Sequence, residues 1–113
     1  MNVRFEIRQN GGVVILGGAL SAANVDTFRD QMHNWLQDNP GVRRVVLDLT
    51  AMDFIDSAGL GVLISLLKYV SEREGDIRLA GLQRRARMVF EITRTYKIFE
   101  IFDTVDEALT AEA

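Results

Sequence analysis

The chain has 113 residues, of which 48% are apolar and 26% are charged, with a net charge of −3 at neutral pH. That length suits one domain, and the composition excludes a disordered chain. The absence of cysteine excludes disulfides, the single histidine argues against a transition-metal site, and the acidic balance gives no general attraction to nucleic acid.

No segment has the pattern of a targeting or membrane-spanning sequence. The longest apolar stretch covers residues 58–67 and is interrupted by glycine and serine, whereas a spanning helix needs about 20 apolar residues. The first six residues alternate between polar and apolar, without the basic region and apolar run of a signal peptide. We therefore expect a cytoplasmic protein without membrane insertion.

The first twenty residues predict a β-hairpin. Apolar residues alternate with polar ones over residues 3–9, and an apolar run covers residues 12–17. Asn10 and Gly11 between them tolerate the positive φ angles that a tight turn requires. A glycine pair directly after the apolar run is expected to end the second strand.

A helix and a central strand follow. Asn24 can accept hydrogen bonds from the free N–H groups at a helix start, and apolar residues then recur at steps of three and four. These residues are Val25, Phe28, Met32, Trp35 and Leu36. Residues 38–41 end the helix, and residues 45–49 form a strand that is apolar on both faces. Such a strand is typical of the centre of a parallel sheet, with a helix on each face.

The rest of the chain continues to alternate between helices and strands. Residues 57 to about 73 predict a helix with Gly75 as its C-terminal cap. The remaining expected elements are a strand over residues 77–81, a helix over 84–93, a strand over 99–102 and a final helix that begins with a capping box at Thr104 and Glu107. This order predicts one α/β domain over residues 1–113, with a mixed β-sheet of four to five strands covered by about four α-helices.

The most informative stretch is residues 52–62, where a buried strand passes through an acidic turn into a helix. Ser57 stands at the start of that helix, with Asp53 and Asp56 before it. The N–H groups of a first helical turn have no partner inside the helix and mark its positive end, so they stabilise a hydroxyl or phosphate there. The run Asp56-Ser57-Ala58-Gly59 closely resembles the Asp-Ser-x-Gly signature of the STAS domain, the fold of bacterial anti-sigma factor antagonists.

This resemblance covers almost the whole chain and implies a function. In such antagonists an anti-sigma factor with serine kinase activity phosphorylates the serine at the position of Ser57, and the unphosphorylated form binds that factor and so frees a sigma factor. A phosphatase acting on phospho-Ser57 would be a further partner. The resemblance implies these partner-binding residues: Leu20, Ser21, Asp56, Gly59, Leu60 and Gly61. Ser21 departs from the family pattern, which usually has aspartate there.

The residue chemistry of this stretch leaves two points open. Ser57 could serve only as the N-cap of its helix. Gly59 and Gly61 could permit close packing inside the protein or close approach of a partner's backbone. Two glycines near a helix start cost about 1 kcal/mol each relative to alanine, so their presence requires one of these reasons.

Enzymes and transport complexes are the competing functional classes. Ser57 lacks the Gly-x-Ser-x-Gly elbow of hydrolases, and no P-loop or complete dinucleotide fingerprint occurs, so we expect no catalysis and no cofactor. Asp48, Asp53 and Asp56 could bind magnesium, but aspartates at strand ends often serve turns, so no metal is expected. The alternative function is a non-phosphorylated STAS subunit or scaffold of a transport or signalling complex.

Overall fold

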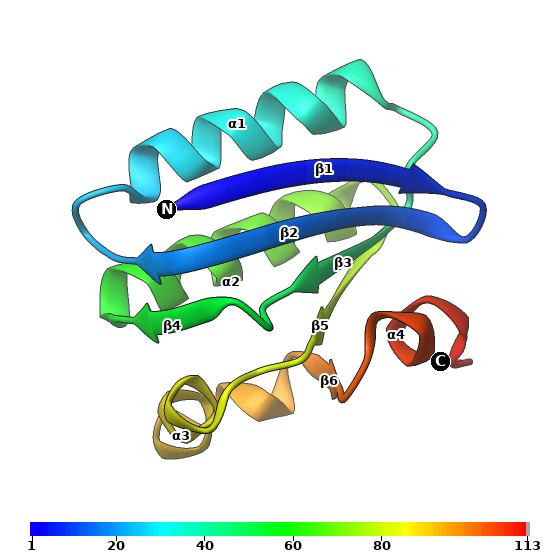
Figure 1. Cartoon of the computed structure of the whole chain (residues 1–113). Helices are drawn as coiled ribbons and strands as arrows, with labels where there is room; N and C mark the ends of the chain where they lie inside the picture. The colour runs from blue at the N-terminus through cyan, green and yellow to red at the C-terminus, as the bar shows by residue number, and fades with distance from the viewer. Residues whose placement is uncertain (113) are drawn as a thin grey trace.

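A mixed β-sheet forms the centre of the computed structural model, which describes residues 1–112 (Figure 1). Its strands are β1 (Asn2–Arg8), β2 (Gly11–Leu20), β3 (Arg44–Asp48), β4 (Met52–Ile55), β5 (Asp76–Ala80) and β6 (Glu100–Phe102). The helices are α1 (Val25–Asp38), α2 (Ser57–Glu72), α3 (Arg84–Ile92) and α4 (Val105–Thr110), and a 3-10 turn, η1 (Thr95–Lys97), precedes β6. The predicted α/β fold with a mixed sheet is confirmed.

The second strand is longer than predicted and changes its partner along its length. The main path of the sheet is β1-β2-β3-β5-β6, with β1 antiparallel to β2 and the other pairs parallel. The first half of β2 pairs with β3, whereas its last residues pair with β4. The prediction that Gly17 and Gly18 end this strand is wrong. Gly18 has a φ of +81°, and its N–H donates to the Ala51 carbonyl (2.9 Å) at an irregularity after which β2 continues to Leu20.

The strand β4 is additional to the predicted order. The expected acidic turn contains a four-residue strand in which Met52 and Ile55 are buried while Asp53 and Phe54 are exposed. Two exposed residues between two buried ones break the alternation that marks a strand in a sequence. Because β4 lies beside the end of β2, it brings the start of α2 to the end of β2.

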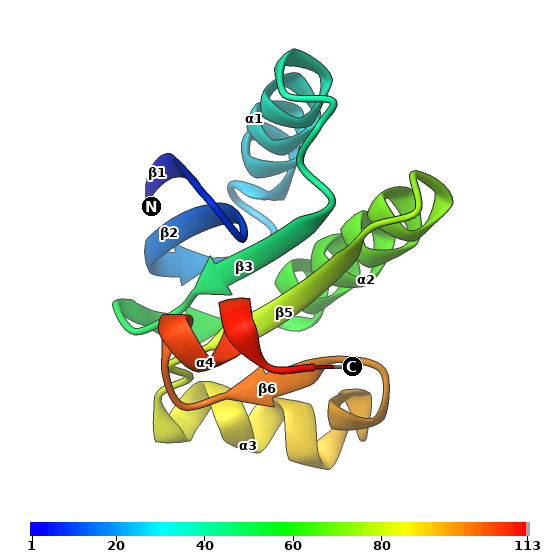
Figure 2. The ribbon, with the colours of Figure 1, turned by 90° about the vertical axis from the view of Figure 1, so that its right-hand side faces the viewer.

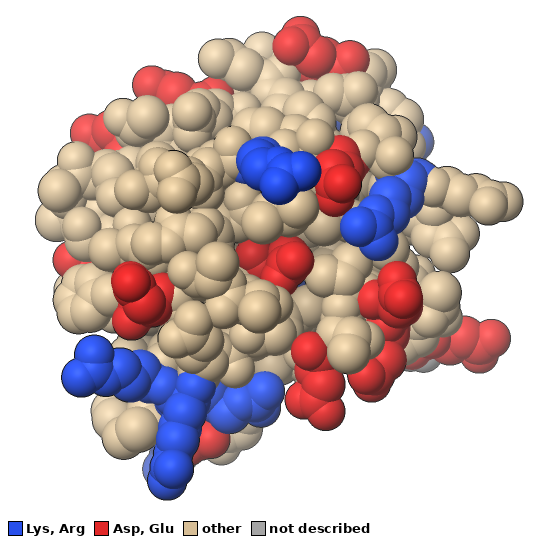
Figure 3. All heavy atoms as spheres, in the orientation of Figure 1, with Lys and Arg blue, Asp and Glu red and all other residues tan. Residues whose placement is uncertain are grey.

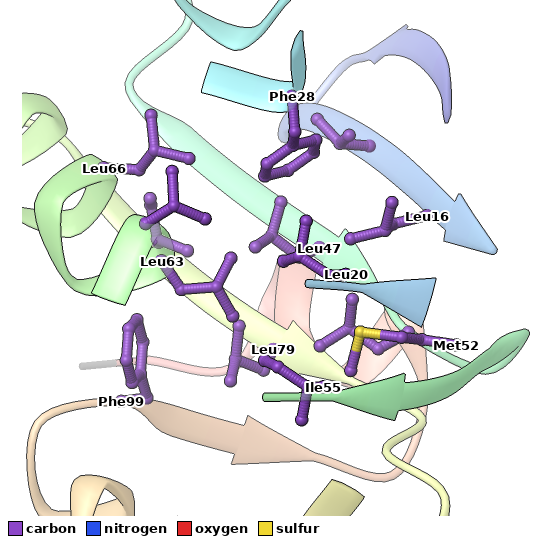
Figure 4. Packing of buried hydrophobic residues seen from close by; sticks show 14 of the residues in the cluster. Leu16, Leu20, Phe28, Leu47, Met52, Ile55, Leu63, Leu66, Leu79 and Phe99 are labelled. Carbon is purple, nitrogen blue, oxygen red and sulfur yellow. The ribbon is translucent and has the colours of Figure 1, made fainter. Parts of the chain in front are cut away.

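Helices cover both faces of the sheet, as the apolar central strand predicts. Helices α1 and α2 pack on one face and α4 packs on the other (Figure 2). Along β3, Val45 and Leu47 belong to the larger core, while Val46 faces the smaller core under α4. Figure 4 shows the larger core, to which α1 contributes Phe28 and α2 contributes Leu63. Among the described residues, no helix has the length and apolarity needed to cross a bilayer.

Arg78 on β5 places a charged side chain in the core beneath α4. Its side chain is fully buried. Its Nη1 donates to the carbonyl oxygens of Ala108 (2.9 Å) and Ala111 (2.6 Å) at the C-terminal end of α4. Carboxylate oxygens of Asp76 and Glu100 lie 3.6 and 3.5 Å from its Nε. Arg78 therefore connects α4 to the sheet.

Two turns differ from the prediction by one residue. The hairpin turn is Gln9–Asn10 rather than the Asn-Gly pair. At the end of α2, Glu74 adopts the left-handed conformation (φ 64°), and the N–H of the following Gly75 donates to the Val70 carbonyl (2.9 Å). Gly75 is therefore not the left-handed residue of the cap. A side chain at this position would collide with the Arg43 carbonyl, which explains the glycine.

Candidate functional site

The start of α2 is fastened to the end of β2 and to the loop that follows it. Asp56 is the N-cap residue: its Oδ1 accepts a hydrogen bond from the Gly59 N–H (2.8 Å), and its Oδ2 accepts one from the Ala22 N–H (3.0 Å). The Asp56 N–H donates to the Leu20 carbonyl (3.3 Å). We call this arrangement the Asp56 junction, because Asp56 joins segments that are 34 residues apart in the sequence.

Ser57 is the first residue of α2, and its side chain is exposed. Because Asp56 supplies the cap, the alternative that Ser57 is only an N-cap is wrong. Among the hydrogen bonds of residues 1–112, none uses the Ser57 hydroxyl. The helix start therefore presents a free hydroxyl beside the positive end of the helix dipole.

The loop between β2 and α1 lies beside this helix start. The Asn24 Oδ1 accepts from the Ser21 N–H (3.0 Å), and the Asn24 Nδ2 donates to the Ala19 carbonyl (2.9 Å). Asn24 is the N-cap residue of α1, as predicted, but its side chain makes no capping hydrogen bond and holds the loop instead. Ser21 is half-buried, and its hydroxyl accepts from the Ala23 N–H (3.3 Å). Through Ala22, the structure brings the loop that contains Ser21 to Asp56.

Two of the predicted partner-contact residues lie inside the protein. Leu20 is fully buried and Leu60 is only 6% exposed. Figure 4 places Leu20 in the larger core, together with Leu16 and Leu47. The apolar side chains of Leu20 and Leu60 fill the core behind the Asp56 junction, and their role in partner binding remains a prediction.

Gly59 and Gly61 have different surroundings, although they are two residues apart in α2. A Cβ on Gly59 would collide with the Leu20 carbonyl oxygen and would lie 2.9 Å from the Ile55 Cγ1. Gly59 therefore permits close packing inside the protein. A Cβ on Gly61 would have no heavy atom within 4 Å. Internal packing explains Gly59 but not Gly61.

Replacing these glycines with alanine is expected to have opposite effects on stability. Gly59→Ala should lower the free energy of unfolding by about 1–3 kcal/mol, because the new methyl group forces the Leu20 carbonyl aside. Gly61→Ala should raise it by up to about 1 kcal/mol, since alanine is the better helix former and the site is open. Urea unfolding measures both changes. Equal changes in the two variants would contradict this difference in packing.

The backbone donors of the junction also set the ionisation of Asp56. Hydrogen bonds from the Gly59 N–H and then from the Ala22 N–H favour the carboxylate, so the pKa of Asp56 lies below its ordinary value. The stability that these hydrogen bonds contribute is fully present above the pKa that Asp56 has in the unfolded chain, about 3.9. It is lost as the pH falls through the lower pKa of the folded protein. The junction is thus complete at neutral pH.

The Asp56→Asn variant is expected to lose less stability than the wild type on acidification. Asparagine does not titrate, so this part of the pH dependence disappears. At pH 7 the variant should be the less stable protein, because an amide has only one acceptor oxygen and can keep at most one of the two hydrogen bonds from Gly59 and Ala22. Urea unfolding at neutral pH and at about pH 3 measures how much stability the wild type and the variant each lose on acidification. Parallel losses in the two proteins would show that the ionisation of Asp56 is not linked to folding.

The three acidic residues near the site are placed separately. The Asp48 Oδ1 accepts from the Thr50 N–H (3.1 Å) and the Thr50 hydroxyl (2.7 Å), whereas Asp53 is exposed and Asp56 belongs to the junction. In the part of the chain that the structure describes, no group of three or more acidic or histidine side chains is placed to hold a metal ion. Asp48 and Asp56 instead hold backbone turns.

Comparison with known proteins identifies the family. The STAS domain model matches residues 2–108. The chain belongs to the STAS domain family. The anti-sigma F factor antagonist of Paenibacillus polymyxa is 30% identical over 112 residues, which cover 97% of this chain and 95% of the relative. The anti-sigma-B factor antagonist of Listeria monocytogenes is 29% identical over 104 residues, which cover 89% of this chain and 90% of the relative.

A solved structure shows that the STAS fold extends over almost the whole chain. The crystal structure of an anti-sigma factor antagonist from Mycobacterium paratuberculosis matches with a TM-score of 0.85 and 23% identity, over 97% of this chain and 92% of that chain. The predicted STAS fold is confirmed. The role of Ser57 as a phosphoacceptor remains a prediction.

Two features of this STAS site were missed by the reading of the sequence. Ala22 contributes only its backbone N–H, which every residue except proline has, so no side chain marks it. Phe54 is 50% exposed although it is apolar. The exposure of Phe54 could have been inferred from its position between Met52 and Ile55, the two residues of β4 that point into the core.

Proposed function

We propose that this protein is an anti-sigma factor antagonist that a partner kinase inactivates by phosphorylating Ser57. The unphosphorylated form binds an anti-sigma factor with serine kinase activity and so frees a sigma factor. The proposal rests on the exposed Ser57 hydroxyl, which is free because Asp56 already caps the helix. The names of the two relatives, an anti-sigma F and an anti-sigma-B factor antagonist, support it.

Electrostatics gives the switch its direction. The hydroxyl of Ser57 is small and neutral, so a partner can approach the helix start closely. A phosphate adds about −1.5 to −2 charges beside Asp53 and Asp56. The helix start stabilises this phosphate within the chain, whereas an acidic side chain or a nucleotide phosphate of the partner is repelled. Phosphorylation therefore releases the partner while the fold is kept.

The proposed contact surface surrounds Ser57. Gly61 lies one turn further along α2, is exposed and has open space around it, so it allows close approach of a partner's backbone. Ser21 lies in the loop that Ala22 ties to Asp56. Asp56 holds this surface together, and Gly59 permits the tight packing beneath it.

Intact-mass analysis after incubation with ATP and the candidate anti-sigma kinases of the source genome tests this proposal. One phosphate should be added to the wild type and to Ser71→Ala, and none to Ser57→Ala. Ser71 is the matched control, because it is an exposed serine of the same helix. A phosphatase acting on phospho-Ser57 should reverse the change. No phosphate on the wild type with any kinase would contradict the proposal and favour the non-phosphorylated subunit of a transport or signalling complex.

A further inference from the structure

A hollow of about 440 Å³ lies between β4 and α3. The strand β4 ends two residues before Ser57 in the chain. We call this hollow the β4–α3 groove. From β4 its lining has Asp53, Phe54 and Ile55, and from α3 it has Arg85, Ala86, Met88, Val89 and Ile92. The Asp56 junction does not use these residues, apart from Ile55, which packs behind Gly59.

The groove exposes large apolar side chains. Phe54 is 50% exposed, Met88 is 50% exposed and Ile92 is 77% exposed. Helix α3 is held to the protein by Phe90, which is fully buried in the core and does not line the groove. The fold therefore does not need the exposed side chains, and apolar residues that gather beside a groove mark a docking surface.

The α3 side of the groove is basic, whereas its β4 side carries one carboxylate, Asp53. Residues 84–97 contain five basic side chains and one acidic side chain, in a chain whose net charge is −3. Figure 3 shows basic side chains gathered at the lower left, over the position of α3 in Figure 1. Of these five residues, only Arg87 forms an ion pair within residues 1–112, with Asp103 at 3.9 Å. Arg84 and Arg85 are exposed and unpaired in that part of the chain, so their charges are available to an acidic partner.

We propose that the β4–α3 groove receives an acidic amphipathic helix of the anti-sigma factor. The apolar stripe of such a helix would pack on Phe54, Met88 and Ile92, and its flanking carboxylates would face Arg84 and Arg85. The identity of the partner rests on the proposed function, whereas the chemistry of the segment rests on the groove itself.

The position of the groove also couples it to Ser57. Ile55 lines the groove and is separated from Ser57 only by Asp56. A phosphate on Ser57 adds negative charge beside one end of the groove, where an acidic segment would be repelled. The phosphorylation switch would then act on this helix as well as on the contacts at Gly61.

Two synthetic helical peptides test the groove directly. They share one apolar stripe and differ in their flanks, which carry glutamate in one peptide and lysine in the other. Titration into the ¹⁵N-labelled full chain, followed by NMR, should shift the amide signals of β4 and α3. The glutamate peptide should bind about tenfold more tightly than the lysine peptide. Ile92→Glu should weaken its binding about tenfold or more, and Arg85→Glu should remove the preference for glutamate.

The matched control is Ile98→Glu. Ile98 is 51% exposed, close to the share for Met88, but it does not line the groove. This variant should bind the glutamate peptide as the wild type does, and circular dichroism of all the variants should show the same fold. Equal binding of both peptides, or unchanged binding by Ile92→Glu, would overturn the proposal. A dimer of the wild type that Ile92→Glu abolishes would also overturn it, because a second copy would then cover the groove.

Phosphorylation separates failure of the groove from failure of the proposed function. If a kinase phosphorylates Ser57 but the groove prefers neither peptide, the groove proposal fails and the antagonist function stands. If the glutamate peptide binds in the groove but no kinase acts on Ser57, the proposal of an acidic occupant is supported. The proposal that this occupant belongs to an anti-sigma factor then fails. If both hold, affinity for the anti-sigma factor should fall about tenfold in Ile92→Glu and stay unchanged in Ile98→Glu.

Discussion

Arg78→Ala is expected to lower the free energy of unfolding by about 2–5 kcal/mol, the range for replacing a large buried side chain with alanine. The substitution removes the donor that binds the carbonyl oxygens of Ala108 and Ala111, and it leaves a cavity beneath α4. Buried carbonyls without partners and lost packing both cost stability. Because a domain of this size has about 5–15 kcal/mol of stability in total, a large fraction of it would be lost.

Urea unfolding of the wild type and the variant measures this loss. Arg78→Met keeps much of the side-chain volume but not the donors, so it should cost about 1–2 kcal/mol less than alanine. Arg29→Ala is the surface control: Arg29 pairs with Asp26 (2.8 Å) on the exposed side of α1, and this change should cost less than about 1 kcal/mol. Hydrogen exchange should show faster opening of α4 in Arg78→Ala. An equal cost for Arg78→Ala and Arg29→Ala would contradict the role of Arg78 in holding α4.

Arg78 also shows why some of the fold could not be predicted from the sequence. The hairpin, the helices and the central strand depend on local periodicity, and each lies close to its predicted place. An arginine within a predicted strand gives no local sign of burial, because its partners Ala108 and Ala111 are about 30 residues away. The strand β4 depends in the same way on distant pairing, since it forms only beside the end of β2.

In the candidate site, too, features set by the local sequence could be predicted, and features set by distant contacts could not. Ser57 at a helix start could be predicted, because the sequence motif is contiguous. That Asp56 rather than Ser57 is the cap depends on the helix boundary, which differs by one residue between the two alternatives. The burial of Leu20 and Leu60 follows from the meeting of β2, β4 and α2, which the motif itself does not describe. Long-range packing therefore decides which residues of the motif are buried and which are exposed.

Phosphorylation of Ser57 is expected to weaken binding of the anti-sigma factor about a hundredfold, equivalent to about 3 kcal/mol. At a separation of roughly 6 Å and an effective dielectric between 20 and 80, each new phosphate–carboxylate pair is repulsive by about 1–5 kcal/mol. Contacts between the phosphate and the helix start offset part of this within the chain. They do not offset the repulsion from acidic groups that the partner brings.

Isothermal titration calorimetry with the purified phosphoprotein and the unphosphorylated protein measures this difference. Ser57→Glu adds one charge rather than nearly two, so it should weaken binding by only about tenfold, whereas Ser57→Ala should bind like the unphosphorylated wild type. Ser71→Glu, which places the same charge at the far end of α2, should change the affinity less than about twofold. Higher salt should reduce the difference in affinity for the anti-sigma factor between the phosphorylated and unphosphorylated proteins, because part of the repulsion is screened. Equal affinity of the two forms would mean that phosphorylation, even where it occurs at Ser57, does not release the partner.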